Sequence, residues 1–410
     1  MQYGLLGEKL SHSYSPELHA MFGDYPYELY EISPEALGDF LRARDFQGLN
    51  VTIPYKTTVM AVCDHLTEAA EAIGSVNTVV REPGGGLLGD NTDAAGFEGM
   101  LWKSEIPVRG KKCLVLGSGG ASLAVQYVLD KQGAGEVVVI SRSGKDSYDN
   151  IHRHKDAQVI INATPVGMYP NTAASPVDLR EFPACEGVLD LIYNPSRTAL
   201  IQQAEALRIP RMGGLYMLVE QARFSAQIFT KKTFSVIRTV DAFQTLRRRK
   251  ENRVLIGMPG CGKTTVGYAL AQFLDRPFVD CDQKLEESFG VSCEDFINRN
   301  GEDAFRDHET ALLAKLGKES GLVISTGGGC VTRAENYPHL HQNGAIIFLE
   351  RELSKLPRKG RPLSLRGNLQ DMYTIRLPMY RRFADLIVAN NAEPERVARN
   401  VEVLYDRFNS

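Results

Sequence analysis

The chain has 410 residues, of which 43% are hydrophobic and 24% are charged, and its formal net charge is −3. This composition is that of a globular protein large enough for several cores, and it favours neither nucleic-acid nor membrane binding. Its 7 cysteines form no C-x-x-C pair, no apolar run approaches the ~18 residues of a membrane span, and the N-terminus lacks a secretory pattern. We therefore expect a cytoplasmic protein, either a monomer or a homodimer, without membrane or nucleic-acid partners.

Strand and helix patterns alternate along the chain, which predicts the α/β class. Serine followed by proline marks two helix starts near the N-terminus, because serine caps a helix and proline fits its first turn. We expect an α/β domain at 1–102, a second at 103–216, a helix at 217–242 that packs back on the first domain, a charged linker at 243–252, and a third domain at 253–410.

The second domain begins with a buried-strand pattern at 112–116, which runs into the loop Gly117-Ser-Gly-Gly-Ala121 and then a helical pattern. Strand, glycine-rich loop and helix together can hold a dinucleotide pyrophosphate at the helix N-terminus. The loop lacks the full G-x-G-x-x-G spacing, so by itself it is a weak indication of a dinucleotide site.

The residues after the next strand, at 136–140, indicate which dinucleotide would bind. An NAD site usually carries an acidic residue here to hold the ribose hydroxyls, whereas this chain has Ser141-Arg-Ser143. The planar guanidinium of Arg142 can pair with a 2′-phosphate, which favours NADP. The alternative is an ordinary surface arginine.

The third domain opens with a strand pattern at 253–256 that runs into Gly257–Thr264, a match to G-x-x-x-x-G-K-[ST], and a helical pattern follows. In such a loop the backbone N–H groups hold phosphate oxygens, Lys263 reaches the outer phosphates, and the Thr264 hydroxyl ligates Mg²⁺. A chance glycine-rich turn is the alternative, and the flanking strand and helix argue against it. The predicted ATP-binding residues are Gly257, Gly260, Cys261, Gly262, Lys263, Thr264 and Thr265.

Further short motifs occur in one order over 1–229. They are Ser13-Tyr-Ser-Pro16, Asn50-Val-Thr-Ile-Pro-Tyr-Lys56, Val76-Asn-Thr78, Asp90-Asn-Thr-Asp93, Asn162-Ala-Thr164 with Gly167-Met168, and Gly214-Leu-Tyr-Met-Leu218 with Gln221. In combination these motifs resemble shikimate dehydrogenase.

The resemblance implies a catalytic pair, Lys56 and Asp93, in which a lysine beside a carboxylate moves a proton or stabilises an alkoxide; the sequence leaves open which role Lys56 has. It also implies a set of substrate-binding residues. Those for the carboxylate are Ser13, Ser15 and Tyr193, and those for the hydroxyls are Thr52, Asn77 and Gln221, with Lys56 and Asp93 completing the site. Each of these residues alone has an ordinary structural explanation, such as a helix cap or a surface charge. We interpret His12 as structural.

The resemblance further implies a Rossmann domain that binds NADP. The cofactor-binding residues would be Gly117, Ser118, Gly119, Gly120, Ala121, Ser141, Arg142, Ser143, Thr164, Gly214 and Met217. The segment from Ser143 to Asp156 is short and polar where the family has a helix and another strand. We therefore predict a trimmed sheet that lacks an edge strand.

From Arg253 onward, motifs beyond the phosphate loop complete a second pattern. They are Asp280-Cys-Asp282, Ala304-Phe-Arg306, Gly327-Gly-Gly329, Gly360-Arg-Pro-Leu363 and Pro378-Met-Tyr-Arg381. With the phosphate loop, they resemble shikimate kinase. The resemblance implies Mg²⁺ ligation by Thr264 and Asp280, catalytic roles for Lys263 and Asp282, and a lid residue, Arg361, that also contacts ATP. The implied substrate-binding residues are Asp282, Arg306, Gly327, Gly328, Gly329 and Arg381.

Three cysteines, Cys261, Cys281 and Cys330, flank the kinase motifs. Cys261 would lie near a helix N-terminus and Lys263, which would favour a reactive thiolate. The alternative is that all three are small packing residues.

Both resemblances together predict a bifunctional enzyme that reduces 3-dehydroshikimate with NADPH and then phosphorylates shikimate at its 3-hydroxyl with ATP and Mg²⁺. Two alternatives stay open at this point. The first is a quinate/shikimate dehydrogenase that uses NAD and is fused to a small-molecule kinase. The second is a module that senses shikimate without turnover.

Overall fold

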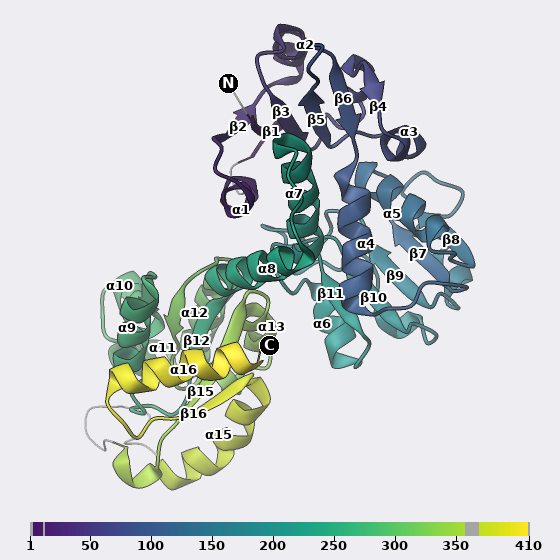
Figure 1. Cartoon of the computed structure of the whole chain (residues 1–410). Coiled ribbons are helices and arrows are strands. Elements are labelled where there is room, and N and C mark those ends of the chain that lie inside the picture. Colours follow the sequence, from purple (N-terminus) through teal and green to yellow (C-terminus); the bar gives the residue numbers. More distant parts are fainter. Residues whose placement is uncertain (1–2, 11–12, 357–368, 409–410) are drawn as a thin grey trace. The chain divides into compact units, whose positions relative to one another are not determined.

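The computed structural model describes residues 3–10, 13–356 and 369–408, and the chain divides into two compact units, 1–247 and 248–410 (Figure 1). Both units consist of β-sheets flanked by helices, so the prediction of the α/β class is confirmed. Among the described residues, no helix is both long and apolar enough to cross a membrane.

The first sheet of unit 1 is mixed, with strand order β2-β1-β3-β5-β6-β4. Its strands are β1 (Tyr3–Gly7), β2 (Tyr27–Glu31), β3 (Gly48–Val51), β4 (His65–Leu66), β5 (Thr78–Arg81) and β6 (Leu87–Asp90). Its helical segments are α1 (Ser15–Phe22), α2 (Pro34–Ala43), η1 (Val59–Val62) and α3 (Glu68–Ile73). All of β3 is buried, because it runs between β1 and β5 in the middle of the sheet. The chain that leaves β3 therefore starts from a rigid position.

The second sheet of unit 1 is parallel, with strand order β11-β10-β9-β7-β8. Its strands are β7 (Lys112–Leu116), β8 (Glu136–Ile140), β9 (Val159–Asn162), β10 (Gly187–Asp190) and β11 (Arg211–Gly213). The accompanying helical segments are α5 (Gly120–Lys131), η2 (Ile151–His154), η3 (Leu179–Glu181) and α6 (Ala199–Ala206). Between β8 and β9 the chain forms η2 but no strand, so β8 stays at the edge and the predicted trimmed sheet is confirmed.

Helices α4 (Thr92–Ser104) and α7 (Leu215–Thr230) lie side by side next to the sheets of unit 1 (Figure 1). Gly96 makes this close packing feasible, since a Cβ there would lie 2.7 Å from the carbonyl oxygen of Met217. Two apolar clusters use α4 and α7: one joins α4 to α5 and the second sheet, and the other joins α7 to α1.

The prediction of one helix at 217–242 followed by a linker at 243–252 is wrong. Helix α7 ends where Lys231 adopts φ 55°, and a second helix, α8, runs over Val236–Lys250. The charged stretch is helical because Thr239, Ala242 and Leu246 recur three and four residues apart and are buried. The boundary between the two units therefore falls inside α8.

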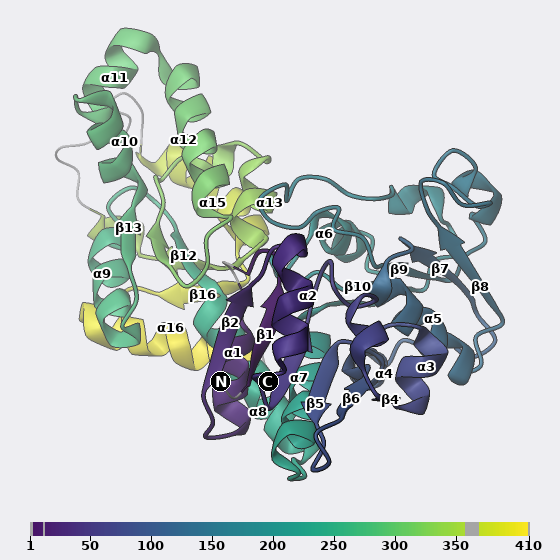
Figure 2. The same ribbon diagram turned by 90° about the horizontal axis from the view of Figure 1, so that it is seen from above.

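Unit 2 contains one parallel sheet with strand order β13-β14-β12-β15-β16. Its strands are β12 (Asn252–Ile256), β13 (Phe278–Asp280), β14 (Val323–Ser325), β15 (Gly344–Glu350) and β16 (Leu386–Ala389). Its helical segments are α9 (Lys263–Leu274), α10 (Cys281–Phe289), α11 (Cys293–Asn300), α12 (Glu302–Leu316), η4 (Cys330–Thr332), α13 (Asn336–His341), η5 (Leu353–Lys355), α15 (Leu369–Phe383) and α16 (Pro394–Phe408). Helices α10, α11 and α12 group together in Figure 2.

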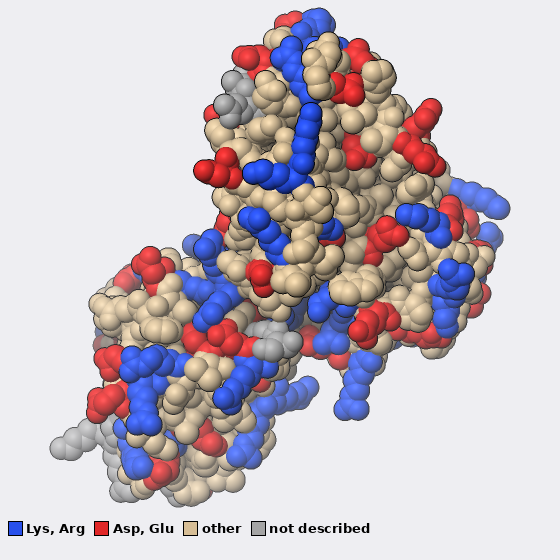
Figure 3. Space-filling view, in the orientation of Figure 1, with Lys and Arg blue, Asp and Glu red and all other residues tan. Residues whose placement is uncertain are grey.

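Charged residues are distributed over both units. On the face shown in Figure 3, Lys and Arg are interspersed with Asp and Glu on each unit. This mixture agrees with the small net charge of −3.

Candidate active sites

The predicted pair Lys56 and Asp93 forms an ion pair in unit 1. Lys56 Nζ lies 2.5 Å from Asp93 Oδ2, and the two side chains are 17% and 10% exposed. Asp93 stands in the first turn of α4, where Asn91 caps the helix by accepting a hydrogen bond from the Asp93 N–H at 3.1 Å. Asn91 also donates to the carbonyl oxygen of Ser75 at 2.8 Å. A cap and a loop contact thus fix the carboxylate beside the ammonium group, an arrangement that can exchange a proton with a ligand.

Two of the predicted carboxylate donors, Ser13 and Ser15, lie at the start of α1, and the third, Tyr193, lies after β10. Ser13 Oγ donates to Ser15 Oγ at 3.1 Å, so the two hydroxyls form one cluster. The ring of Tyr193 packs against that of Tyr14, between these serines, with centroids 5.2 Å apart. Burial raises the pKa of Tyr193 to about 12, so its hydroxyl stays a protonated donor at neutral pH.

Asn77 has its side-chain carbonyl fully engaged. Asn77 Oδ1 accepts hydrogen bonds from Thr92 N at 2.7 Å, from Thr92 Oγ1 at 3.1 Å and from Thr78 Oγ1 at 3.0 Å. The amide nitrogen is consequently the group that Asn77 can offer to a ligand hydroxyl. Gln221, on α7, reaches the same group of residues, since its Oε1 lies 3.5 Å from Thr92 Oγ1.

The sequence analysis assigned no role to the residues that support Asn77, and it missed Ser225 altogether. Asn50 Nδ2 donates to Ser225 Oγ at 2.7 Å and to Thr78 Oγ1 at 3.1 Å, and Ser225 Oγ lies 3.0 Å from Thr92 Oγ1. All four of these residues are buried. Their hydrogen bonds connect β3, β5, α4 and α7, the elements that carry or adjoin the predicted substrate residues Asn77 and Gln221. One signal was available in the sequence, because Ser225 follows Gln221 by one helical turn on α7.

The glycine-rich loop between β7 and α5 lies next to Lys56. Gly117 has φ 105°, and a Cβ there would come within 2.9 Å of Thr164, so both its backbone and its surroundings require glycine. Gly119 precedes α5 and no side chain caps the helix, so its first N–H groups can receive an anion. A Cβ on Gly120 would lie 3.3 Å from Ser75 Oγ and 3.6 Å from Lys56 Cδ. A dinucleotide at this loop would therefore lie beside the Lys56–Asp93 ion pair.

The remaining predicted cofactor residues surround the ends of the same strands. Arg142 is exposed just after β8. Thr164 follows β9 and donates to Asn162 Oδ1 at 2.7 Å. Gly214 precedes α7 where a Cβ would be 2.0 Å from the carbonyl oxygen of Leu191. Ser118, Ala121, Ser141, Ser143 and Met217 lie at the adjoining ends of these strands and helices. Thr52, which was predicted to bind a substrate hydroxyl, directly follows β3 of the first sheet, where its N–H donates to the carbonyl oxygen of Leu6 at 2.9 Å.

In unit 2, the loop from Gly257 to Gly262 joins β12 to α9. Gly257, Gly260 and Gly262 have φ of 149°, 82° and 97°, so each adopts backbone that disfavours other residues. The Lys263 ammonium group folds back over the loop and donates to the carbonyl oxygens of Gly257 at 2.9 Å and Met258 at 3.2 Å. This geometry is that of a phosphate-binding loop.

Thr264 and Asp280 form a pair of oxygen ligands beside this loop. Thr264 Oγ1 donates to Asp280 Oδ2 at 2.7 Å, while Asp280 Oδ1 caps α10 through the N–H of Asp282 at 3.0 Å. Hard oxygen donors suit Mg²⁺, which keeps several of its waters and needs few protein ligands. The two residues therefore fit the metal predicted from the sequence, and Thr265 follows on the same exposed turn of α9.

Gly327 and Gly329 lie against three charged side chains. A Cβ on Gly327 would lie 2.3 Å from Glu309 Oε1 and 2.9 Å from Asp282 Oδ1, and one on Gly329 would lie 2.1 Å from Arg306 Nη2. Arg306 Nη1 donates to Glu309 Oε2 at 2.7 Å. Burial raises the pKa of Glu309, a residue that the sequence analysis missed, and the ion pair with Arg306 opposes this. The structure thus brings Asp282, Arg306 and the glycines together.

Arg381 is not part of this group, which corrects the sequence-based assignment. Its side chain is 57% exposed and its Nη2 lies 3.5 Å from Glu350 Oε1. Arg376, one turn before Tyr380 on α15, is the buried arginine instead. Arg376 Nη1 and the Tyr380 hydroxyl both donate to the carbonyl oxygen of Gly328, at 3.1 Å and 2.5 Å. Five residues rotate a helix by much more than one turn, so Arg376 and Arg381 face different ways.

The three kinase cysteines are packing residues. Cys261, Cys281 and Cys330 are wholly buried in the core of unit 2, and burial raises the pKa of Cys330 to about 12 and that of Cys281 well above its usual range. Of the two interpretations of Cys261, the burial of its side chain favours the packing residue over a thiol that reagents can reach. Two further residues singled out in the sequence, His12 and Arg361, lie outside the described residues.

Comparison with known families agrees with this division of the chain. The family profile of the shikimate dehydrogenase substrate binding domain matches residues 5–79, and that of shikimate kinase matches residues 259–404. The chain is 35% identical to the shikimate dehydrogenase (NADP(+)) of Caldanaerobacter subterraneus subsp. tengcongensis, over 57% of this chain and 92% of the relative.

Solved structures are similar over the same part of the chain. One is a chorismate mutase/shikimate 5-dehydrogenase fusion protein from Clostridium acetobutylicum, with a TM-score of 0.57, 37% identity, and coverage of 60% of this chain and 97% of the other. Another is the shikimate 5-dehydrogenase of Thermus thermophilus in complex with NADP(H) and shikimate, with a TM-score of 0.54, 32% identity, and coverage of 60% and 99%. The chain therefore belongs to the shikimate dehydrogenase family through its N-terminal part and carries a shikimate kinase domain at its C-terminus, which makes it a bifunctional enzyme of the shikimate pathway.

Proposed function

We propose that unit 1 reduces 3-dehydroshikimate to shikimate with NADPH. The observation that supports this most is the Lys56–Asp93 pair, which lies beside the dinucleotide loop at Gly120. When bound, NADPH supplies the hydride for the carbonyl carbon. Lys56 donates its hydrogen bond and then its proton to the carbonyl oxygen, because negative charge develops there as the hydride arrives. Asp93 holds the ammonium group in place, and a proton from solvent restores the charge of Lys56 after the transfer.

Substrate recognition in this proposal divides between two groups of side chains. The hydroxyls of Ser13, Ser15 and Tyr193 bind the carboxylate, while the amide nitrogen of Asn77 and the side chain of Gln221 bind ring hydroxyls. Because Asn77 Oδ1 accepts hydrogen bonds from three donors, the side-chain amide can rotate little. Its NH₂ group therefore donates in a fixed direction, and the site favours a ligand that places an oxygen there.

We further propose NADP as the preferred dinucleotide. The exposed guanidinium of Arg142 follows β8 without a neighbouring acidic residue in the sequence, so it can pair with the 2′-phosphate. An NAD-dependent quinate dehydrogenase is the second candidate, and it would require an acidic acceptor for the ribose hydroxyls, which residues 141–143 do not include.

We propose that unit 2 transfers the γ-phosphoryl group of ATP to the 3-hydroxyl of shikimate. Thr264 and Asp280 would hold Mg²⁺, which would supply positive charge to the phosphates. Lys263 turns from the loop carbonyls to the phosphate oxygens, Asp282 orients the acceptor hydroxyl and takes its proton, and Arg306 with Arg376 binds the carboxylate. Gly327 and Gly329 let the ring approach these groups.

Initial-rate measurements of both activities, made on the full chain, test these proposals. Reduction of NADP⁺ and NAD⁺ would be compared with shikimate and quinate as substrates, and ADP formation would be followed with shikimate, ATP and Mg²⁺. We expect turnover of shikimate with NADP⁺ to exceed the other three dehydrogenase combinations. A better rate with quinate and NAD⁺ supports the second candidate, and binding of shikimate without any turnover supports a sensing module.

A further inference from the structure

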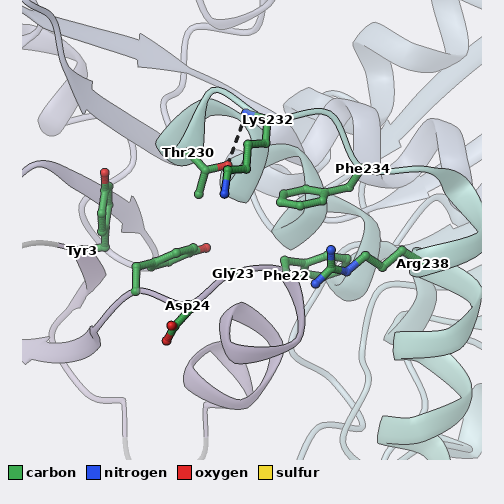
Figure 4. Close-up of a pocket in the computed structure, with 9 residues that line it drawn as sticks. Tyr3, Phe22, Gly23, Asp24, Thr230, Lys232, Phe234 and Arg238 are labelled. Carbon is green, nitrogen blue, oxygen red and sulfur yellow. Dashed lines mark hydrogen bonds between the residues drawn. The ribbon is translucent and has the colours of Figure 1, made fainter.

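A cavity in unit 1 lies at the end of α1 that is remote from Ser15 (Figure 4). Its volume is about 420 Å³, and it is lined by Tyr3 of β1, by the C-terminal end of α1 with the residues that follow, by the end of α7, and by the start of α8. We propose that this cavity binds a small aromatic carboxylate and that the ligand changes substrate affinity at the dehydrogenase site.

Aromatic rings form the apolar part of the cavity. Phe22 and Phe234 are 1% and 8% exposed, and their ring centroids lie 5.9 Å apart. Tyr3 and Tyr25 form an edge-to-face pair with centroids 5.0 Å apart. Rings at two sides of a cavity favour a flat aromatic ligand, because such a ligand can stack on one ring and meet another edge-on. Its volume of about 420 Å³ lies within the range of small-molecule sites, so one ring with a short substituent fits inside it.

Two cations give the cavity its preference for a carboxylate. Figure 4 shows Lys232 and Arg238 reaching toward the cavity, from the α7–α8 connection and from α8. Arg238 Nε and Nη2 donate to the carbonyl oxygen of Met21, at 3.1 Å and 2.8 Å, which fixes the guanidinium and leaves Nη1 for a ligand. Within the described part of the chain, the Lys232 ammonium group has no ion-pair partner. The one acidic lining residue, Asp24, is exposed and points away from both cations in Figure 4.

Helix α1 connects the cavity to the dehydrogenase site. It begins at Ser15, one of the proposed carboxylate donors, and ends at Phe22, a wall of the cavity. Between them, His19 is 1% exposed, and its ring stacks on Tyr27 with centroids 4.0 Å apart. Burial lowers the pKa of His19 to about 3, so the ring is neutral, and its Nδ1 is hydrogen-bonded to the Tyr25 hydroxyl at 2.6 Å.

The same contacts continue into the buried polar group below Asn77. The Tyr27 hydroxyl donates to Asn50 Oδ1 at 2.8 Å, and Asn50 in turn donates to Ser225 and Thr78. A ligand that stacks on Phe22 and Tyr25 therefore contacts two connections to the substrate residues. One is helix α1, and the other is the set of contacts that starts at Tyr25 and ends at Ser225 and Thr78. Because these groups are close-packed, we expect a displacement at the cavity to alter the position of Ser15.

Isothermal titration of the full chain with sodium benzoate tests the binding, with saturating shikimate and NADP⁺ present to occupy the dehydrogenase site. We expect saturable binding at one site, at least tenfold weaker binding of uncharged benzyl alcohol, and at least tenfold weaker benzoate binding by Lys232→Glu. The matched control is Lys103→Glu, the same change of charge at an exposed lysine of α4, which should stay within twofold of the unchanged protein. Absence of binding, equal binding by the Lys232→Glu protein, equal binding of the alcohol, or an equal loss in the control overturns the proposal.

The coupling is tested by the KM for shikimate with and without benzoate, and only this part depends on the proposed dehydrogenase function. We expect benzoate to shift KM at least twofold in the unchanged protein and in the Lys103→Glu protein, and not in the Lys232→Glu protein. In Tyr25→Phe, which removes the hydrogen bond to His19, benzoate should still bind while the KM shift is lost. If the KM for shikimate does not change when benzoate saturates the cavity, the coupling is refuted, while the result on benzoate binding is unaffected. If the protein shows no dehydrogenase activity, the proposed function is contradicted, but the proposal that the cavity binds an aromatic carboxylate is not.

Discussion

Two arginines on α15 allow a direct test of the kinase site, because the structure assigns them opposite roles. Arg376 is buried and donates to the carbonyl oxygen of Gly328, whereas Arg381 is 57% exposed and lies 3.5 Å from Glu350. Replacing Arg376 with Met removes a charged hydrogen-bond donor from the proposed carboxylate site, at a cost of about 1.5–3 kcal/mol. Since about 1.4 kcal/mol is a tenfold change, kcat/KM for shikimate should fall roughly 10- to 100-fold. For Arg381→Met, an exposed ion pair contributes about 0.5 kcal/mol or less, so we expect a change of about twofold.

The assay is ADP release at several shikimate concentrations with saturating ATP and Mg²⁺. Melting temperature and dehydrogenase rate, measured on the same preparations, show whether the Arg376→Met protein is still folded, and Arg376→Lys provides a milder variant that keeps the charge. KM for ATP should be almost unchanged in all three variants. The reasoning is refuted if Arg381→Met lowers kcat/KM for shikimate more than Arg376→Met does, or if both variants lower it equally.

Three further predictions concern single side chains. In Lys263→Ala we expect kinase activity to be lost and NADPH oxidation to stay intact, and in Lys56→Ala we expect the reverse. Both activities would be assayed on the same preparations, and loss of both in either folded variant contradicts independent sites. In Arg142→Asp, KM for NADPH should rise at least tenfold more than KM for NADH, and an equal rise for both would show that Arg142 does not contact the 2′-phosphate. Burial raises the pKa of Asp190 from 3.8 to about 6, so the folded state binds the extra proton and its stability should fall as the pH rises through that window. Chemical denaturation from pH 4 to pH 7 should show this fall, and it should be smaller in Asp190→Asn; an identical pH dependence in both proteins contradicts the assignment.

Local patterns were sufficient to predict the features that depend on a few consecutive residues. The loop at Gly257–Thr264 and its flanking strand and helix could be predicted, because backbone requirements and chemistry coincide in one short segment. The ion pair of Lys56 with Asp93 could be expected only through the resemblance to a family, since nothing in the spacing of the two residues brings them together.

Features that depend on packing could not be predicted from the sequence. The charged residues of α8 indicated a linker, and the three buried positions that make it a helix are informative only once a partner surface exists. Arg376 and Arg381 are both plausible carboxylate ligands in the sequence, and only the orientation of α15 separates them. Asn50 and Ser225 are distant in sequence, so their hydrogen bond becomes evident only in the folded chain.

The central claim is that one chain carries out two consecutive reactions, and product analysis tests it most directly. The purified full-length protein would be incubated with 3-dehydroshikimate, NADPH, ATP and Mg²⁺, and the products identified by mass spectrometry. We predict shikimate 3-phosphate in the complete mixture, shikimate alone when ATP is omitted, and neither product when NADPH is omitted. Failure to form shikimate 3-phosphate in the complete mixture, by a protein whose folding is verified, would contradict the account.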